Sequence, residues 1–151
     1  LIVKIEKGGG GNDAKCCIEE CLQAANRLVW NPQGAKVLVA IVDTYPNGVQ
    51  GKSRKCQNSI HWSDEVELLE NNGIKIYSIF AGNDDGVRDF YQKISDRTDG
   101  RLIPISDIHL MAEILVAIAM KEAGNLEKYL ETQEQTGKIT QKQKQTLLLL
   151  K

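Results

Sequence analysis

The sequence predicts an α/β domain built on a doubly wound, mostly parallel sheet with helices on both faces. Along the chain, apolar stretches rich in β-branched residues alternate with segments of helical periodicity. This alternation is typical of parallel sheets whose crossover helices lie on the two faces. A length of 151 residues fits one domain, and a hydrophobic fraction of 42% can supply its core.

Four apolar segments are predicted as strands, and the second is the clearest. It has the sequence KVLVAIV, and because it is apolar at nearly every position, we expect both of its faces to be buried. Asp43 closes this strand, and a polar, glycine-containing loop follows as far as residue 59. The predicted strands are residues 1–5, 36–42, 74–80 and 101–105.

Helical spacing of apolar residues separates these strands. Asp13 is the expected N-cap of the first helix, Ser63 that of the second, and Ser106 or Asp107 that of the last, in which Gly124 marks a point of division. The predicted helices are residues 14–29, 63–71, 86–97 and a long helix after residue 107.

The end of the chain differs in composition from the rest. Residues 136–151 consist largely of Gln, Lys and Leu and have no sustained apolar period. We expect the domain to span residues 1–135, followed by a polar extension at 136–151 that is mobile or forms a short helix docking on a partner.

Charge and cysteine content argue against several classes of protein. Nineteen basic residues against twenty acidic ones give a net charge of -1, which does not predict binding to nucleic acid or an anionic membrane. The four cysteines lack the CxxC pairs and histidine spacing of a zinc site and are typical of buried thiols in a reducing compartment. Neither a signal peptide nor a membrane span is predicted, so we expect a cytoplasmic location.

The loops that follow the strands are where a ligand is expected, because such sheets bind ligands beyond the carboxyl ends of their strands. Asp13 and Asp43 both lie there, and two carboxylates with a hydroxyl such as that of Thr44 nearby suit a hard divalent cation such as Mg²⁺. The alternative is that Asp13 only caps a helix and Asp43 only ends a strand. Their spacing leaves both interpretations open.

Catalysis has weaker support. The glycine run at residues 8–11 could cradle a phosphate, but neither the GK[ST] of a P-loop nor a complete GxGxxG is present. Cys56 and His61 could pair as nucleophile and base, yet no orienting third group is recognisable. We therefore expect a binding protein and not an enzyme, with a nucleotide-binding or hydrolytic enzyme as the remaining alternative. Four other residues are interpreted structurally: Asp84 and Asp85 as a solvated turn, Trp30 and Trp62 as packing residues.

The order of several motifs resembles a von Willebrand factor A domain. GGGGND is followed by a helix ending near Trp30 and then by KVLVAIVD, which is similar to the middle of that domain. DEVELLENNGIKIYSIFAG and FYQKISDRTDGRLIPISD, with Thr98–Gly100 in a tight turn, are similar to its later part. The resemblance covers residues 1–130 and rests on the order and spacing of these motifs.

The resemblance implies a Rossmann-like sheet with a metal-ion-dependent adhesion site at its top. In this family a DxSxS motif, a Thr or Asp from a glycine-rich loop and an Asp after a central strand hold Mg²⁺, and a carboxylate of a partner protein completes its coordination. The second of these inputs maps to Asp13 and the third to Asp43. The family therefore implies a protein-interaction module that binds a protein partner.

The sequence departs from this family pattern in one large respect. DxSxS does not occur in the chain, which begins where the family's third strand is expected, so the resemblance is to the later two-thirds of the domain. Cys16 and Cys17 also replace the glutamate-like position after the glycine loop. We therefore expect weak or absent Mg²⁺ binding by the isolated chain. The alternative function is that of a structural subunit or fragment whose sheet edge is completed by another chain.

Overall fold

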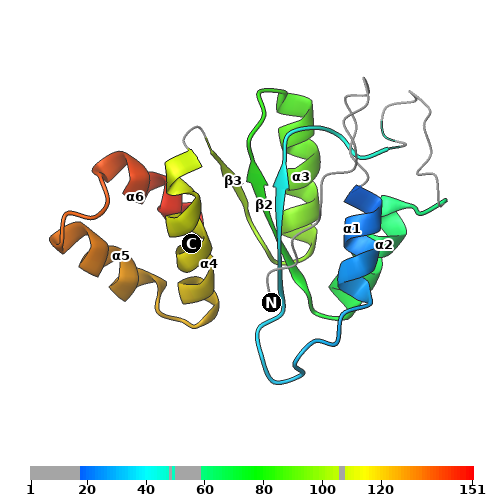
Figure 1. Ribbon diagram of the computed structural model, residues 1–151, viewed down its shortest axis with the longest axis horizontal. Coiled ribbons are helices and arrows are strands. Elements are labelled where there is room, and N and C mark those ends of the chain that lie inside the picture. Colours follow the sequence, from blue (N-terminus) through cyan, green and yellow to red (C-terminus); the bar gives the residue numbers. More distant parts are fainter. Residues whose placement is uncertain (1–17, 48, 50–58, 106–107) are drawn as a thin grey trace.

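The computed structural model describes residues 18–47, 49, 59–105 and 108–151 (Figure 1). Several predicted features lie outside the described residues: the strand at residues 1–5, Asp13, and the helix caps Ser106 and Asp107.

A three-stranded parallel sheet lies at the centre of the structure, in the order β1–β2–β3. The strands are β1 (Val37–Val42), β2 (Lys75–Phe80) and β3 (Leu102–Pro104). In the register, Val37 lies beside Lys75, and Ser78 lies beside Leu102. The predicted parallel α/β architecture is confirmed for these strands, which lie inside the predicted segments and are shorter by one or two residues.

Helices cover both faces of the sheet, which divides the core into two clusters. The first core joins helices α1 (Ile18–Asn26), α2 (Trp62–Asn71) and α3 (Asp85–Arg97) to one face of the sheet, through residues such as Leu22, Leu69 and Tyr91. The second core lies on the other face, where α4 (Met111–Glu122) packs against Tyr77, Ile79 and Ile103. Neighbouring residues of β2 enter different cores because side chains alternate along a strand.

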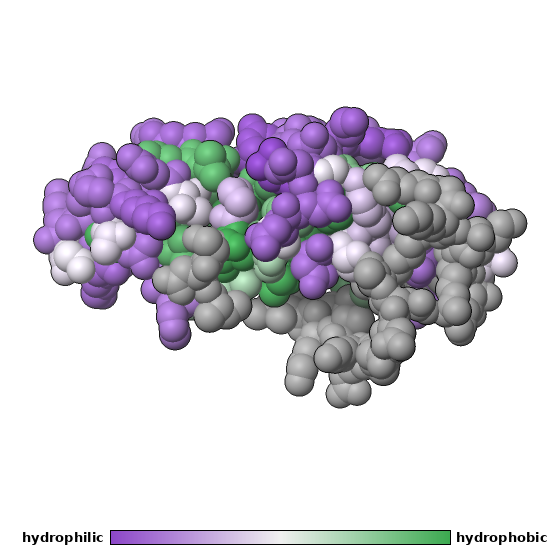
Figure 2. All heavy atoms as spheres, turned by 90° about the horizontal axis from the view of Figure 1, so that it is seen from above, coloured by the Kyte–Doolittle hydropathy of each residue, from purple (hydrophilic) through white to green (hydrophobic). Residues whose placement is uncertain are grey.

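The C-terminal helices form a compact group around α4. A short 3₁₀ helix (Ile108–Leu110) leads into α4, and Gly124, at φ +71°, separates α4 from α5 (Leu126–Gln135). The predicted division at Gly124 is confirmed, since this left-handed conformation ends a helix at little strain only for glycine. In the view from above, hydrophobic residues are exposed near the middle of the molecule, beside the hydrophilic surface of α5 (Figure 2).

The expectation of a mobile polar extension at 136–151 is wrong for most of this segment. Thr140 begins helix α6 (Gln141–Leu148) with a capping box completed by Gln143. Leu147 and Leu150 are fully buried in the second core. The predicted short helix is therefore present, and it docks on its own chain because two of its leucines complete that core.

Other local predictions also need correction. The first helix ends at Asn26 and does not continue to Val29, whose side chain is fully exposed. The N-cap position of α2 is His61 and not Ser63, whose hydroxyl bonds to the Asp64 carboxylate (3.0 Å). Strand β1 is an edge strand of the described sheet and is only half buried, with Ile41 60% exposed. The expectation that both of its faces are buried is therefore wrong at Ile41.

Candidate functional site

The carboxyl edge of the sheet is the edge at which β1 and β2 end, and the loops after these strands touch there. The amide of Ala81 donates to the carbonyl of Val42 at 2.8 Å. A Cβ placed on Gly82 would lie 2.8 Å from the carbonyl oxygen of Asp43, which is closer than a side chain tolerates. Glycine at position 82 therefore lets the loop after β2 pass directly against the backbone of Asp43.

Asp43 is the one residue of the predicted metal pair that the structure places. It is exposed and follows β1 directly, at the carboxyl edge, as the sequence predicts. Asp13 lies outside the described residues, so its distance from Asp43 stays a prediction. The glycine run at 8–11 and Cys56, whose pairing with His61 had weak support, also lie outside the described residues.

The described residues contain no group of three or more His, Cys, Asp or Glu side chains placed to hold a metal ion. Asp84, which follows β2 in the next loop along the chain, has a structural role. Its carboxylate accepts hydrogen bonds from the amides of Gly86 (2.8 Å) and Val87 (3.1 Å) and so caps α3. The interpretation of this segment as a turn before a helix is thus sharpened to an N-cap.

An aromatic group fixes the loop after β1 to the first core. Phe90 contacts Tyr45 and Trp62 edge to face, with ring centroids 5.9 and 4.8 Å apart. A Cβ on Gly86, the second residue of α3, would lie 2.3 Å from the hydroxyl of Tyr45, so glycine at this position lets the Tyr45 side chain lie against the start of the helix. The interpretation of Trp62 as a packing residue is confirmed.

The backbone of this loop is held at two further points. The hydroxyl of Tyr91 on α3 donates to the carbonyl of Thr44 at 3.1 Å. Asn47 hydrogen-bonds Glu19 of α1 through both its backbone and its side chain. Residues 44–47, which follow Asp43, are thereby attached to two different helices.

Glu19 itself is a buried carboxyl group near the start of α1. It is 1% exposed, and its Oε2 has no hydrogen-bond partner among the residues that the structure describes. Burial raises its pKa above 4.5, although hydrogen bonds from its own backbone and from Asn47 act in the opposite direction. This residue was not singled out from the sequence.

A second buried carboxylate, on α2, faces α1 and accepts hydrogen bonds through both of its oxygens. Glu65 of α2 accepts from Gln23 Nε2 at 3.2 Å and from Asn26 Nδ2 at 2.7 Å. Gln23 and Asn26 lie on the face of α1 that meets α2. These bonds make the contact between α1 and α2 partly polar and fix how the two helices pair.

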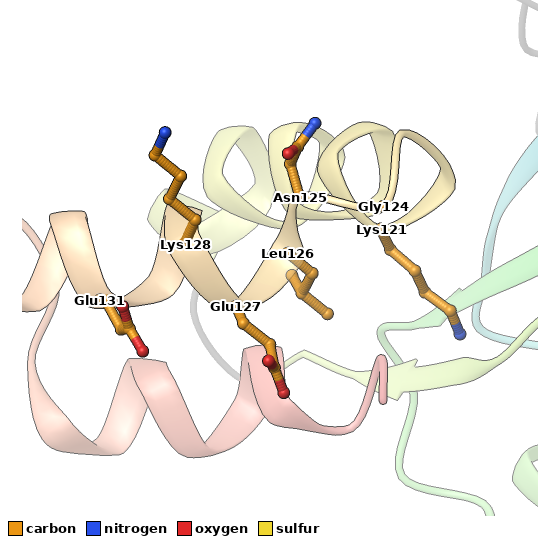
Figure 3. Close-up of a pocket in the computed structure, with 7 residues that line it drawn as sticks. All are labelled: Lys121, Gly124, Asn125, Leu126, Glu127, Lys128 and Glu131. Carbon is orange, nitrogen blue, oxygen red and sulfur yellow. The ribbon is translucent and has the colours of Figure 1, made fainter.

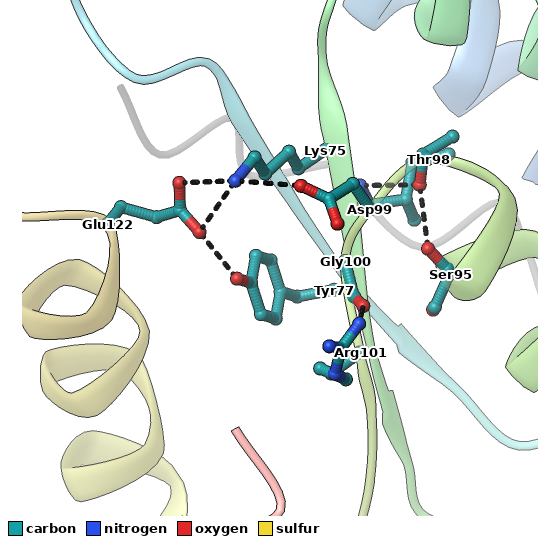
Figure 4. Close-up of polar contacts among 9 residues, drawn as sticks. Lys75, Tyr77, Ser95, Thr98, Asp99, Gly100, Arg101 and Glu122 are labelled. Atoms are coloured by element: carbon teal, nitrogen blue, oxygen red, sulfur yellow. Dashed lines mark hydrogen bonds and ion pairs between the residues drawn. The ribbon is translucent and has the colours of Figure 1, made fainter. Parts of the chain in front are cut away.

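A charged network lies at the opposite, amino edge of the sheet (Figure 4). Lys75 Nζ is 3.1 Å from Glu122 Oε2 and 3.3 Å from Asp99 Oδ2, and the hydroxyl of Tyr77 donates to Glu122 Oε1 at 2.5 Å. Lys121 Nζ lies 5.5 Å from the centre of the Tyr77 ring. This network joins β2 to the end of α4.

The network changes the pKa of its members. Burial and the bond to Glu122 raise the pKa of Tyr77 well above 10. Burial lowers the pKa of Lys75, but its bonds to Glu122 and Asp99 outweigh that effect and raise it. Burial, with repulsion from Arg101, lowers the pKa of Lys121. These groups connect elements of the fold.

The turn at Thr98–Gly100, which directly follows α3, packs against the amino edge of the sheet. The hydroxyl of Thr98 accepts from the amide of Ile76 at 2.9 Å and is itself buried. A Cβ on Gly100 would lie 2.0 Å from the carbonyl oxygen of Ile76. The turn that contributes to the sequence resemblance is therefore packed directly on the backbone of β2.

A shallow hollow of about 510 Å³ lies at the corner between α4 and α5 (Figure 3). Its polar side chains diverge: Lys121 points toward the sheet, Lys128 away from it, and Glu127 and Glu131 toward α6. A binding pocket places a few polar groups so that they converge on a ligand. This hollow is therefore not a candidate site.

The chain matches no protein-family model, no curated protein and no solved structure. Among the helices of the described residues, none is both long and apolar enough to cross a membrane. The carboxyl edge, with Asp43 and the anchored loop behind it, is accordingly the candidate site that the geometry favours.

Proposed function

We propose that this chain is a protein-binding module of the von Willebrand factor A type, with the carboxyl edge of its sheet as the binding face. The observation that carries the proposal is the position of Asp43, exposed at the end of β1 where the loops after β1 and β2 meet. Parallel α/β sheets bind their ligands at this edge. The parallel sheet and the order of the sequence motifs are consistent with such a module.

In this proposal Asp43 and Asp13 contribute carboxylate oxygens to one divalent cation, and a partner protein supplies a further carboxylate. Mg²⁺ prefers a nearly octahedral shell of oxygen ligands and keeps several waters when few protein ligands are present. Two carboxylates alone hold it weakly, so the cation and the protein partner are expected to bind together. The chain acts as a binding protein and carries out no reaction.

Titration calorimetry with Mg²⁺ and Mn²⁺ tests the role of Asp43. We expect weak binding by the unmodified chain that is lost in Asp43→Ala. Asp85→Ala is a suitable control, because Asp85 is also exposed near this edge and its removal leaves the Asp84 cap in place. Tight binding that Asp43→Ala leaves unchanged would contradict the assignment.

The open edge of β1 favours a second candidate function, a structural subunit of a larger assembly. Within the described sheet β1 pairs with β2 alone. Its side chains are apolar on both faces: Leu38 and Ala40 pack on the first core, Val37 and Val39 on the second. Edge strands are usually protected by charges, proline or bulges, and VLVAIV has neither charge nor proline. A strand of another polypeptide could therefore extend the sheet.

Sedimentation over a range of protein concentrations tests this second function. If β1 pairs with a second copy of the chain or with a partner, we expect Ile41→Lys to weaken assembly, because it places a charge at an exposed position of this strand. Leu68→Lys is the matched control, since Leu68 is also exposed but belongs to helix α2 and not to the edge strand. A well-folded monomer at every concentration, with no partner recovered through β1, would count against a structural subunit.

A further inference from the structure

The outer face of α4 is apolar although it is exposed to solvent. Ile114, Ala117 and Ile118 are buried in the second core. Ala112 and Val116 lie on the opposite side of the helix and are exposed, Val116 to 44%. Surface helices normally place polar residues away from the core, and a helix that is apolar all round is usually covered on every side. The composition of α4 therefore predicts a further covering element on its outer face.

A hollow of about 370 Å³ lies beside this outer face, between α4, α5 and the turn after α5. It is lined by Ala112, Glu113, Val116, Tyr129, Gln133 and Lys138. Its wall is partly apolar, and it contains a single carboxylate. A hollow of this kind suits a side chain that has an apolar stem and a cationic end, which is the chemistry of lysine.

Glu113 supplies this hollow with an acceptor that lacks a donor. Its Oε2 is buried and has no hydrogen-bond partner within the described part of the chain. Burial raises the pKa of Tyr129 above its ordinary value of 10, and the charge of Glu113 acts in the same direction, so the two side chains lie near each other. An acceptor that is removed from water without a donor is unfavourable. The Glu113 carboxylate therefore favours an incoming cation.

Lys138 carries the complementary charge in the lining of the same hollow. It is exposed, and two nearby carboxylates already have other partners, since Glu134 pairs with Lys144 and Glu127 with Lys151. Lys138 forms no ion pair with any residue that the structure describes. One surface thus offers an anion and a cation, both without an oppositely charged partner, next to an apolar helix face.

We propose that this surface joins two copies of the chain around a two-fold axis, with Lys138 of each copy entering the hollow of the other to pair with Glu113. The stem of the lysine packs along Val116 while its ammonium reaches the carboxylate. A two-fold interface brings the same surface of both copies together, so each contact occurs twice. Both charges are then satisfied, whereas a different protein that offered only a lysine would meet the like charge of Lys138.

Sedimentation of charge-reversal variants, alone and mixed, tests this dimer. Glu113→Lys and Lys138→Glu should each weaken dimerisation by about tenfold or more, because two attractive pairs per dimer become repulsive. When the two variants are mixed in equal amounts, they should associate with each other, since every lysine then faces a glutamate across the interface. The double variant should recover the dimer for the same reason. A merely structural role of either residue would not produce this recovery.

Lys128→Glu and Glu131→Lys are the matched controls. They make the same changes of charge at exposed positions of α5 that do not line this hollow, so they should sediment like the unmodified chain. Circular dichroism checks that each variant is folded. Lys138 is exposed between two helices, so its reversal should leave the fold intact and decides the case even if Glu113→Lys does not fold. A monomer at every concentration, or a dimer that Lys138→Glu leaves unchanged, overturns the proposal.

This dimer depends neither on the cation proposed at Asp43 nor on the open edge of β1. Ile41→Lys should leave it intact, because Ile41 belongs to β1 and not to the α4 surface. Assembly that Ile41→Lys abolishes and Lys138→Glu does not change would support the β1 edge and exclude the α4 dimer. Loss of metal binding in Asp43→Ala, with the dimer retained, would support both proposals separately.

Discussion

The hydroxyl of Tyr77, on the central strand, donates a 2.5 Å hydrogen bond to the carboxylate of Glu122 near the end of α4. Tyr77 is fully buried and Glu122 nearly so, with 10% of its side chain exposed. The bond therefore joins the sheet to the C-terminal helices away from water. Because the acceptor is charged, we expect it to contribute more than an ordinary hydrogen bond.

Replacing Tyr77 by Phe should lower the free energy of unfolding by about 1.5 kcal/mol, since Glu122 keeps Lys75 as a partner but loses its other donor. Urea denaturation followed by circular dichroism measures the change. Tyr129→Phe is the control, because Tyr129 lies in the same half of the molecule and is half buried. Equal effects of the two substitutions would show that the bond to Glu122 contributes nothing specific.

Alkaline pH should weaken the fold through the same residue. The pKa of Tyr77 is raised above its ordinary value of 10 by burial and by Glu122. A group whose pKa is raised on folding contributes stability that is complete below the unfolded pKa and is lost as pH rises through the folded one. Stability should therefore fall above about pH 10, and less steeply in Tyr77→Phe. Parallel curves for the two proteins would contradict this assignment.

Gly100→Ala should be among the most damaging single substitutions. The added methyl group would lie 2.0 Å from the carbonyl oxygen of Ile76, and a strand backbone cannot move aside as a side chain can. We expect a loss of about 3 kcal/mol, seen as a lower midpoint of thermal unfolding. At Gly34 the same change meets only ordinary contacts, at 3.5 Å, so Gly34→Ala should leave the midpoint nearly unchanged.

Leu147→Ala tests whether α6 belongs to the folded core. Leu147 is completely buried, and its truncation should cost about 2–4 kcal/mol through lost burial and the cavity left behind. Leu149, two residues later, is 48% exposed, so Leu149→Ala should have a much smaller effect. Denaturant unfolding of both variants distinguishes the cases. Equal, small losses would indicate that α6 does not pack as described.

Strand positions and their parallel arrangement were predictable because apolar β-branched runs and helical periods alternate so regularly. The edge position of β1 was not, since an apolar strand looks the same whether its neighbours are present or not. The docking of α6 was also missed. Its leucines follow a run of Gln and Lys, and their burial depends on packing against α5 and the distant strand β3, which the local sequence pattern does not reveal.

The residues of the candidate site also differ in whether the sequence could predict them. Asp43 was predictable because a carboxylate after a buried strand has a defined place in a parallel sheet. Glu19 was not, since IEECLQAAN contains two adjacent glutamates and only the orientation of α1 decides which one is buried. Its partner Asn47 comes from a distant loop, and the fold alone brings the two together.

The alternation of β2 side chains between the two cores has a consequence for cooperativity. Ile76 and Phe80 belong to the core of α1–α3, while Tyr77 and Ile79 belong to that of the C-terminal helices. If either half unfolds, side chains of β2 become exposed, and the other half loses part of the strand on which it packs. The two layers should therefore unfold in a single transition, and the amides of β2 should be the last in the molecule to exchange with deuterium.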